Sequence, residues 1–158
     1  MTAALPVPPA ELSDPTPALL GSDRVEVRRP VALAALGRLD RLRRPYGPVV
    51  ASGGLAAFLL APGTADAVPD LLHWLGWGAE LELGLTARPA GAPRVPRPRG
   101  AEEVPPRPEN RCDVPPAVWL RPGANGPGLD LRSPDLLRLL DCLADACARD
   151  LMGLAPAA

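Results

Sequence analysis

The amino-acid sequence predicts one small α+β domain. Its 158 residues are enough for one domain and short for two. Two segments, Arg24–Arg28 and Glu80–Leu85, alternate strictly between polar and apolar residues, which is typical of half-buried strands. The run Ser133-Pro134-Asp135 has the residue types that begin a helix, and a leucine-rich stretch follows it. Strands and helices therefore share one chain, in which no repeat of fixed period occurs.

The first part of the chain predicts a tail, a strand and a helix. Residues 1–22 are rich in proline, and we expect a disordered tail with at most a short turn at 17–20. In the strand at Arg24–Arg28, the valines would face the core and the charged side chains would face solvent. Pro30 suits the first turn of a helix that ends before Pro45. Its expected apolar stripe is Leu33, Leu36, Leu39 and Leu42.

A hairpin, a second helix and a fourth strand follow. Strands at 47–52 and 55–61 flank Gly53-Gly54, which predicts a hairpin. We expect a helix from Thr64 to about Trp77, either bent at Pro69 or starting near Val68, and then the strand at 80–85. This β-α-β-β-α-β order predicts a ferredoxin-like (RRM-like) antiparallel sheet with both helices on one face.

The last third adds an extra short strand and a C-terminal helix. We expect a flexible, Pro- and Arg-rich insertion at about 98–116 and a strand at 117–120. The final helix starts after Ser133 and ends at Gly153, so the domain spans 23–152 and residues 153–158 form a tail. Its expected apolar stripe is Leu136, Leu139, Leu140, Leu143, Cys147 and Leu151.

Composition narrows the function classes. The 17 Lys+Arg and 18 Asp+Glu residues give a net charge of −1, which disfavours a general polyanion-binding protein but leaves room for a local basic patch. The sequence shows no secretory signal and no apolar run of about 18 residues, so we expect no membrane contact. An odd cysteine count (Cys112, Cys142 and Cys147) without a signal indicates reduced thiols and a cytoplasmic location.

Complete catalytic or metal-binding motifs are missing. His73 has no nucleophile in a recognised pattern nearby, and we interpret it as a partly exposed helix residue. Cys142 and Cys147 would lie about 140° apart on a helix, too far round to share a metal, so Cys147 is expected in the core. Glu80 and Glu82 share a strand face and could hold Mg²⁺, but we favour ion pairs across the sheet with Arg24 and Arg28.

Arginine-rich stretches supply the binding candidates. The basic cluster is Arg24, Arg28, Arg29, Arg38, Arg41, Arg43 and Arg44, and a second one is Arg88, Arg94, Arg97 and Arg99. Guanidinium forks suit phosphates, but only 3% of residues are aromatic and none interleaves with these arginines. Nucleic acid is therefore weakly supported, and a protein partner is favoured. The candidate contacts are Arg24, Arg28, Arg41, Arg44, Trp74 and Trp77.

Several stretches resemble one known family. They are Arg24–Leu39 (RVEVRRPVALAALGRL), Gly47–Pro62 (GPVVASGGLAAFLLAP), Leu81–Pro98 and Val118–Pro122. Over about residues 23–152 the chain resembles the N-terminal domain of bifunctional DNA primase/polymerases, in particular small actinobacterial (streptomycete) members. The resemblance implies an RRM-like sheet, in agreement with the element order above.

The resemblance also implies where catalytic residues would stand. Active members carry Asp-x-Asp on the first strand, and the matching positions here are Glu26 and Arg28. Their third-strand His matches Ala56, and a further Asp matches Leu85, with Glu82 the nearest carboxylate. Two-metal chemistry needs acidic ligands at both ions, so these vestigial positions imply an inactive copy without a cofactor.

Three functional hypotheses remain open. The favoured one is a catalytically inactive primase/polymerase-like domain that acts as a binding or regulatory module. The second is an active, Mg²⁺-dependent DNA primase/polymerase that uses Glu26, Glu80 and Glu82. The third is a protein-interaction module whose proline-rich segments bind a partner in extended conformations.

Overall fold

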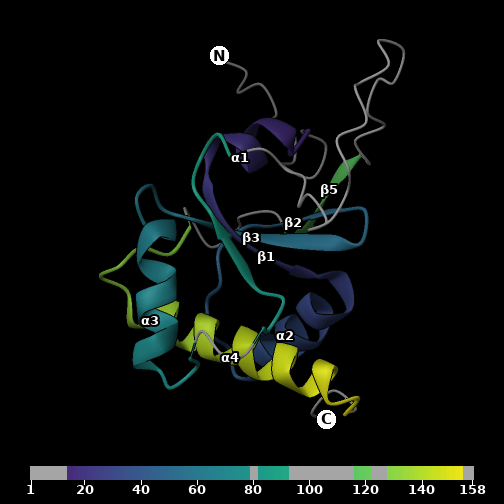
Figure 1. Cartoon of the computed structure of the whole chain (residues 1–158). Helices are drawn as coiled ribbons and strands as arrows, with labels where there is room; N and C mark the ends of the chain where they lie inside the picture. Colours follow the sequence, from purple (N-terminus) through teal and green to yellow (C-terminus); the bar gives the residue numbers. More distant parts are fainter. Residues whose placement is uncertain (1–13, 79–81, 93–115, 122–127, 155–158) are drawn as a thin grey trace, which may run out of the picture.

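A five-stranded antiparallel sheet forms the centre of the computed structural model, which describes residues 14–78, 82–92, 116–121 and 128–154 (Figure 1). Within these residues the strand order is β4-β1-β3-β2-β5. The strands are β1 Asp23–Arg28, β2 Val49–Ser52, β3 Leu55–Leu60, β4 Thr86–Arg88 and β5 Ala117–Arg121. The helices are α1 Thr16–Gly21, α2 Arg29–Arg41, α3 Val68–Trp74, which a 3₁₀ turn at Ala65–Ala67 precedes, and α4 Pro134–Leu151. The α+β class predicted from the sequence is confirmed.

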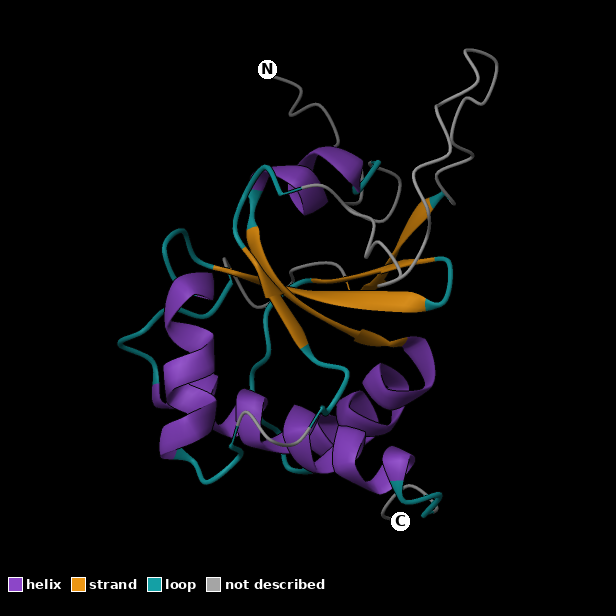
Figure 2. Cartoon of the chain, viewed as in Figure 1, coloured by secondary structure: helices purple, strands orange, loops and turns teal. Residues whose placement is uncertain are grey.

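The two faces of the sheet are covered differently. Helices α2, α3 and α4 lie on one face, and the short α1 lies on the other (Figure 2). The helix-covered face holds the main apolar core, to which β1 contributes Val25 and Val27 and α4 contributes four buried leucines. A second, smaller cluster on the opposite face joins Leu19 of α1 to Val50, Ala57 and Leu59.

In β1 the valines face the core, as the sequence predicts, but two of the charged residues do not face solvent. Val25 and Val27 are fully buried among the helices. Arg24 and Glu26 were expected to face solvent, yet they are 0% and 5% exposed. They are buried because α1 and the segment after β4 cover that face of the sheet, as the contacts of Arg24 below show.

The hairpin and the last strand agree with the sequence. Strands β2 and β3 pair from Val49↔Phe58 to Ser52↔Leu55, and Gly53 turns with a φ of +59°. A positive φ favours glycine because other residues carry a Cβ that clashes there. Strand β5 pairs with β2 at the edge of the sheet, and its range, Ala117–Arg121, agrees with the strand predicted at 117–120.

Helices α2 and α4 form where the sequence predicts them, but not every residue predicted to be buried in them is buried. Helix α2 buries Val31, Ala32, Ala35, Leu36 and Leu39, whereas Leu33 and Leu42 are exposed. A strict three-residue spacing drifts round a helix of 3.6 residues per turn, so the predicted stripe was wrong at both ends. In α4 the predicted positions are buried except Leu151, which lies in the last turn and is exposed.

The second helix and the fourth strand differ from the prediction in extent. Helix α3 starts at Val68, one of the two alternatives left open, and ends at Trp74. The strand expected at 80–85 was wrong: Glu80 lies outside the described residues, and residues 82–85 form no strand. Gly84 has a φ of +72°, which interrupts an extended backbone, and the strand forms later, as β4. Strand β4 pairs antiparallel with β1.

The domain also begins earlier than expected. Residues 14–22, placed in the disordered tail, include α1, whose Leu19 is buried against the sheet. Burying one leucine contributes about 2 kcal/mol, which favours docking of this short helix. Residues 1–13, most of the insertion predicted at 98–116, and the end of the expected C-terminal tail lie outside the described residues.

Close backbone contact joins the segment before α4 to the end of β3. Leu129 forms a parallel bridge with Leu60, and the Ala61 N–H donates to the Leu129 carbonyl at 3.0 Å. A Cβ on Gly128 would lie 2.5 Å from the Leu59 carbonyl oxygen, which real contacts do not allow. Glycine is therefore required at position 128.

Helices in the described ranges are all too short or too polar to span a bilayer.

Candidate functional site

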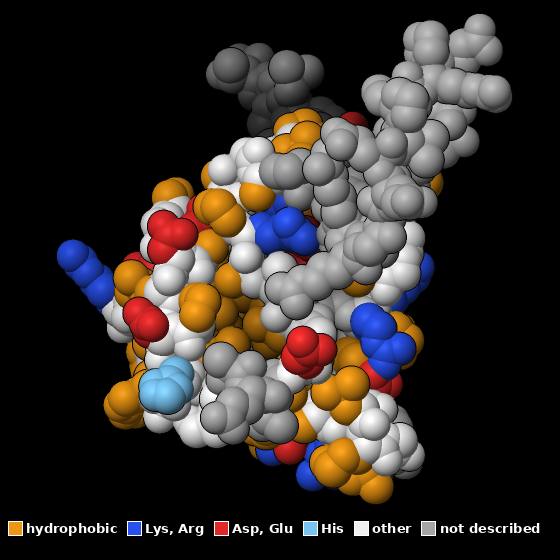
Figure 3. All heavy atoms as spheres, in the orientation of Figure 1, with side chains coloured by type: hydrophobic (Ala, Val, Ile, Leu, Met, Phe, Trp, Pro, Cys, Tyr) orange, Lys and Arg blue, Asp and Glu red, His pale blue; other side chains and the backbone are white. Residues whose placement is uncertain are grey.

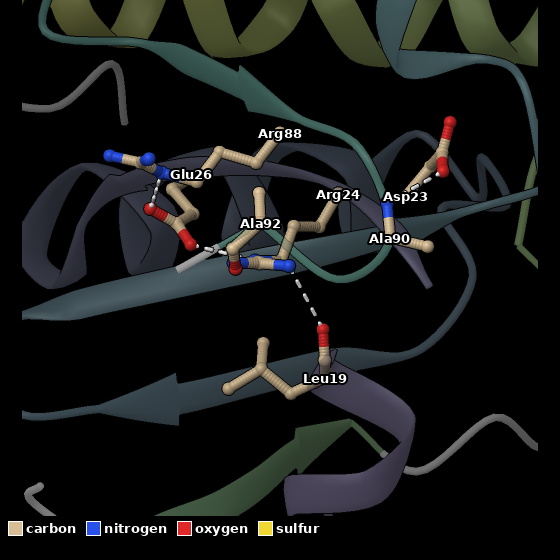
Figure 4. Close-up of polar contacts among 7 residues, drawn as sticks. All are labelled: Leu19, Asp23, Arg24, Glu26, Arg88, Ala90 and Ala92. Atoms are coloured by element: carbon tan, nitrogen blue, oxygen red, sulfur yellow. Dashed lines mark hydrogen bonds and ion pairs between the residues drawn. The ribbon is translucent and has the colours of Figure 1, made fainter. Parts of the chain in front are cut away.

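A buried polar cluster lies on the sheet face that α1 covers. Its centre is Glu26 in the middle of β1, whose neighbours across the sheet are Ala57 of β3 and Thr86 of β4. Arg24 Nε donates to Glu26 Oε1 at 2.7 Å, and Arg88 Nε donates to Glu26 Oε2 at 2.8 Å (Figure 4). Both carboxylate oxygens of Glu26 are thus bound by guanidinium groups.

Arg24 also links two segments to the sheet. Its Nη1 donates to the Leu19 carbonyl at 3.1 Å, and its Nη2 donates to the Ala92 carbonyl at 3.0 Å (Figure 4). The Gly91 N–H donates to the Leu20 carbonyl at 2.8 Å, so α1 and the segment after β4 also touch each other. The planar guanidinium fork can serve these partners at once, which a lysine could not do in the same geometry.

Asp23 anchors the start of β1. Its Oδ2 accepts from the Ala65 N–H at 2.9 Å, and its Oδ1 accepts from the Ala90 N–H at 3.0 Å. One buried carboxylate therefore fixes both the 3₁₀ turn before α3 and the turn after β4. Buried polar groups need such partners because an unsatisfied one costs about 1–3 kcal/mol.

The divalent metal that the resemblance implies does not fit this arrangement. Glu26 already binds two guanidinium groups, and Arg28 forms an ion pair with Asp150 of α4. Ala56 and Leu85 both pack with the helix-covered core, so neither shares a face with Glu26. Across the described ranges, no group of three or more His, Cys, Asp or Glu side chains is placed to hold a metal ion.

We expected Arg24 and Arg28 to form ion pairs with Glu80 and Glu82, but among the described residues Arg24 pairs with Glu26 and Arg28 pairs with Asp150. Glu82 is exposed, and Glu80 lies outside the described residues. The later start of β4 places Arg88, not a glutamate, opposite Arg24. Arg24 then pairs with Glu26 on its own strand. Of the alternative metal site, Glu26 is bound by two arginines and Glu82 is exposed, while Glu80 lies outside the described residues.

The arginine-rich cluster of the sequence is dispersed in the fold. Arg24 is buried under α1, whereas Arg28 and Arg38 form ion pairs with acidic residues of α4. Arg41 and Arg44 are exposed at the C-terminal end of α2. On the face drawn in Figure 3, cationic and anionic side chains stand singly among hydrophobic ones. Arg24 therefore adds nothing to an exposed basic surface, and the charges of Arg28 and Arg38 are partly compensated by α4.

The two tryptophans predicted as contacts have different environments. Trp77 Nε1 donates to Asp141 Oδ1 at 2.9 Å, which ties the end of α3 to α4. Trp74, in the last turn of α3, is 73% exposed. His73 beside it is also exposed, in agreement with the prediction of an ordinary helix residue. Trp74 is thus the candidate contact with the most accessible apolar surface.

Two cysteines lie in the helix-covered core. Cys147 is buried as expected, and Cys142 is buried as well. Burial raises the pKa of Cys147 to about 11 and also raises the pKa of Cys142. Because the thiolate is the reactive form, both thiols are held in their unreactive state at neutral pH.

A second polar cluster ties β5 to the end of α2. The Tyr46 hydroxyl donates to Asp40 Oδ1 at 2.7 Å, and Arg121 Nη2 lies 3.3 Å from Asp40 Oδ2. Burial, followed by the hydrogen bond to Asp40, raises the pKa of Tyr46. The hydrogen bonds that Arg121 donates to Tyr46 and Asp40 raise the pKa of Arg121. This cluster holds an edge strand and presents no free carboxylate pair.

Sequence reasoning missed two members of the buried cluster. The sequence pattern places Arg88 with the later arginines and not in the fourth strand. If the fourth strand is taken to start at Thr86, its predicted pairing with the first strand brings Arg88 close to Glu26. Asp23 gave no signal, because its partners are backbone N–H groups of distant turns.

Comparisons of the chain with protein-family models, with curated proteins and with solved structures find no match. The described fold and site define an α+β protein with a five-stranded antiparallel sheet and a charge-compensated polar cluster.

Proposed function

We propose that the chain is a catalytically inactive primase/polymerase-like domain that acts as a binding or regulatory module for a protein partner. The observation that carries the proposal is the state of Glu26. It is the one acidic residue left at the family's catalytic positions, and both its oxygens are bound by arginines.

The strand order supports a ferredoxin-like (RRM-like) fold for this module. Strands β4-β1-β3-β2 follow one another as antiparallel neighbours. Helix α2 connects β1 to β2 and helix α3 lies between β3 and β4, both on the same face. A β-α-β-β-α-β chain with this sheet order is the ferredoxin-like arrangement. Strand β5 and helix α4 would be additions to it.

Loss of catalysis follows from charge. Two-metal nucleotidyl transfer needs carboxylates that clamp both ions. At the first position Glu26 is neutralised by Arg24 and Arg88, and at the second Arg28 carries a positive charge. A cation at Glu26 would meet two arginines in place of an open carboxylate, and the repulsion would be strong because this position is buried, whereas Arg28 is more than half exposed.

Protein is favoured over nucleic acid as the partner. The net charge is −1, and several of the arginines are used in ion pairs within the domain. Trp74 offers a large exposed aromatic side chain, a residue type that is enriched where protein surfaces meet.

Primer synthesis and nucleotide incorporation, measured with Mg²⁺ and with Mn²⁺, test the catalytic part. We expect no incorporation above the protein-free blank with either ion. In parallel, Mn²⁺ should cause no selective broadening of the amide resonances of Val25, Glu26 and Val27. Incorporation that disappears in a folded Glu26→Gln variant would overturn the proposal and favour the active-enzyme alternative.

Capture of partners from the native host tests the binding part. We expect the Trp74→Ala variant to lose a partner that the wild-type chain retains. Leu33→Ala is the matched control, because Leu33 is another exposed apolar helix residue, on α2. Capture that is unchanged in Trp74→Ala but lost on removal of residues 1–13 would favour the proline-rich segments instead. Tight, saturable binding of single-stranded DNA or RNA would contradict a protein partner.

A further inference from the structure

An open groove lies between α2 and α4 on the side of the domain away from the buried polar cluster. The two helices pack side by side (Figure 1), yet they leave a cavity of about 160 Å³ between them. Small side chains leave this space empty, since each alanine reaches only one carbon from its backbone. The apolar part of the lining is Pro30, Val31, Ala34, Ala35, Cys142, Ala146 and Leu154.

Charged residues at the groove are unevenly balanced. Arg38 of α2 and Arg149 of α4 both line the groove, and both donate to the same atom, Asp145 Oδ2, at 2.8 and 2.9 Å. Asp150 also lines the groove, but Arg28 pairs with it. The two arginines and two aspartates of the lining balance each other, and Arg28, which pairs with Asp150 from outside the lining, adds one positive charge beside the groove.

The two arginines keep donors for another anion. A guanidinium group has five N–H donors, and in the described part of the chain Arg38 and Arg149 each use one on Asp145. A second carboxylate could therefore bind both arginines beside Asp145. Both side chains are about two-fifths exposed, so a ligand can reach them from solvent.

We propose that this groove binds a small amphipathic carboxylate, with its apolar part against Ala34 and Ala146 and its carboxylate on Arg38 and Arg149. An apolar cavity of about 150 Å³ accommodates a benzene-sized molecule. The volume here therefore suits one aromatic ring or a chain of about six carbons. The planar guanidinium favours a carboxylate, which it can bind through two parallel hydrogen bonds. This site is independent of the proposed function, because it shares no residue with the buried cluster or with Trp74.

Titration of the full chain with benzoate, followed by amide chemical shifts and by calorimetry, tests the proposal. We expect saturable shifts at Ala34, Ala146 and their neighbours. Benzyl alcohol and benzylamine have the same ring without the negative charge, and we expect them to bind at least about tenfold more weakly, since one lost charge-assisted contact is worth about 1.4 kcal/mol. The proposal is overturned if benzoate causes no saturable shift at millimolar concentration, or if benzyl alcohol binds as well as benzoate.

Four variants separate the apolar and charged parts of the site. Ala34→Leu fills the groove with a residue that favours helices, and it should abolish binding. Arg149→Gln should weaken benzoate binding about tenfold, whereas Asp145→Asn should strengthen it, because the competing carboxylate is gone. Arg138→Gln is the control: Arg138 is also on α4 but pairs with Asp135 and does not line the groove.

Folding is monitored by circular dichroism in each case, and Ala146→Leu replaces Ala34→Leu if that variant is unfolded. Equal weakening by Arg138→Gln and Arg149→Gln would show a nonspecific charge effect and refute the site. Unchanged affinity in a folded groove-filling variant would refute it as well.

Discussion

The two faces of the sheet are held by opposite kinds of interaction. On the helix-covered face the strands meet apolar side chains of α2, α3 and α4. On the other face a small apolar cluster adjoins Arg24, Glu26 and Arg88, and α1 is bound partly through a guanidinium group. A sheet face without a full helical layer can thus be closed by buried charge, provided that every charge and polar atom has a partner.

The largest fall in the free energy of unfolding is expected from removing the Arg24 side chain. Arg24→Ala should lower the free energy of unfolding by about 3–5 kcal/mol, because it breaks a buried ion pair and leaves two carbonyl groups without a donor. Leu139→Ala on the opposite face should cost about 2–5 kcal/mol through a cavity. Urea unfolding followed by tryptophan fluorescence measures both.

Comparable losses would show that the polar cluster stabilises its face as strongly as the apolar core stabilises the other. Arg24→Met combined with Glu26→Leu and Arg88→Met is the control, since it removes all three charges of the cluster together and should recover part of the loss. A cost below about 1 kcal/mol for Arg24→Ala, the value of a surface ion pair, would contradict a buried, structural role.

The next largest loss of stability is expected at Gly128, where two backbone segments touch beside the apolar core. Gly128→Ala should cost about 1–3 kcal/mol, because the added Cβ meets the backbone of Leu59 and Leu60, which cannot move without disturbing β3. Gly37→Ala in α2 is the control: its Cβ would meet nothing within 4 Å, and alanine favours a helix by about 1 kcal/mol. Equal thermal stability of the two variants would contradict the close approach.

Much of the helix-covered face could be predicted from the sequence, and little of the other face could. Val25, Val27 and the leucines of α4 repeat at the periods of a strand and a helix, so local patterning identifies them. Arg24 and Glu26 alternate just as regularly, but periodicity cannot show whether a polar face meets water or a covering segment. Their burial depends on Leu19 and Ala92, and Ala92 lies 68 residues away from Arg24.

The register of β4 limited the prediction of the site itself. Alternation at 80–85 suggested a strand, but the positive φ of Gly84 moves pairing to Thr86–Arg88. A later register exchanges the expected glutamate partners for Arg88. Because one strand carries both the pairing and the charge, this single difference replaces the expected ion pairs of Arg24 and Arg28 with glutamates of the fourth strand by a cluster in which Arg88 binds Glu26.

A smaller change, in the pH dependence of the free energy of unfolding, is expected from Cys147 on the helix-covered face. Its pKa is raised to about 11 by burial, whereas an unfolded thiol has the ordinary value of 9.0. Below the unfolded value both states are protonated, so the full stabilisation is present there. Between about pH 9 and 11 only the unfolded state loses its proton, and the free energy of unfolding falls by on the order of 2 kcal/mol.

Cys147→Ala should remove this part of the alkaline slope when urea unfolding is measured at pH 8, 9 and 10. Tyr46 also titrates in this range, but it is common to both proteins, so the difference between their slopes reports Cys147. Parallel slopes would contradict a thiol that the core holds neutral.

We expect the smallest change in the free energy of unfolding at the rim of the helix-covered face, where the side chains are partly exposed and neither kind of interaction is fully buried. Trp77→Phe keeps the ring but removes the Nε1–H donor to Asp141, a hydrogen bond in an exposed position. We expect a loss of about 0.5–1.5 kcal/mol in the free energy of unfolding. Trp74→Phe is the matched control and should leave stability unchanged, because Trp74, at the end of α3 and three residues before Trp77, is mostly exposed. A larger loss for Trp74→Phe than for Trp77→Phe would mean that α3 is fixed to the domain through Trp74, and Trp74 would then be a structural residue and not a surface for a partner.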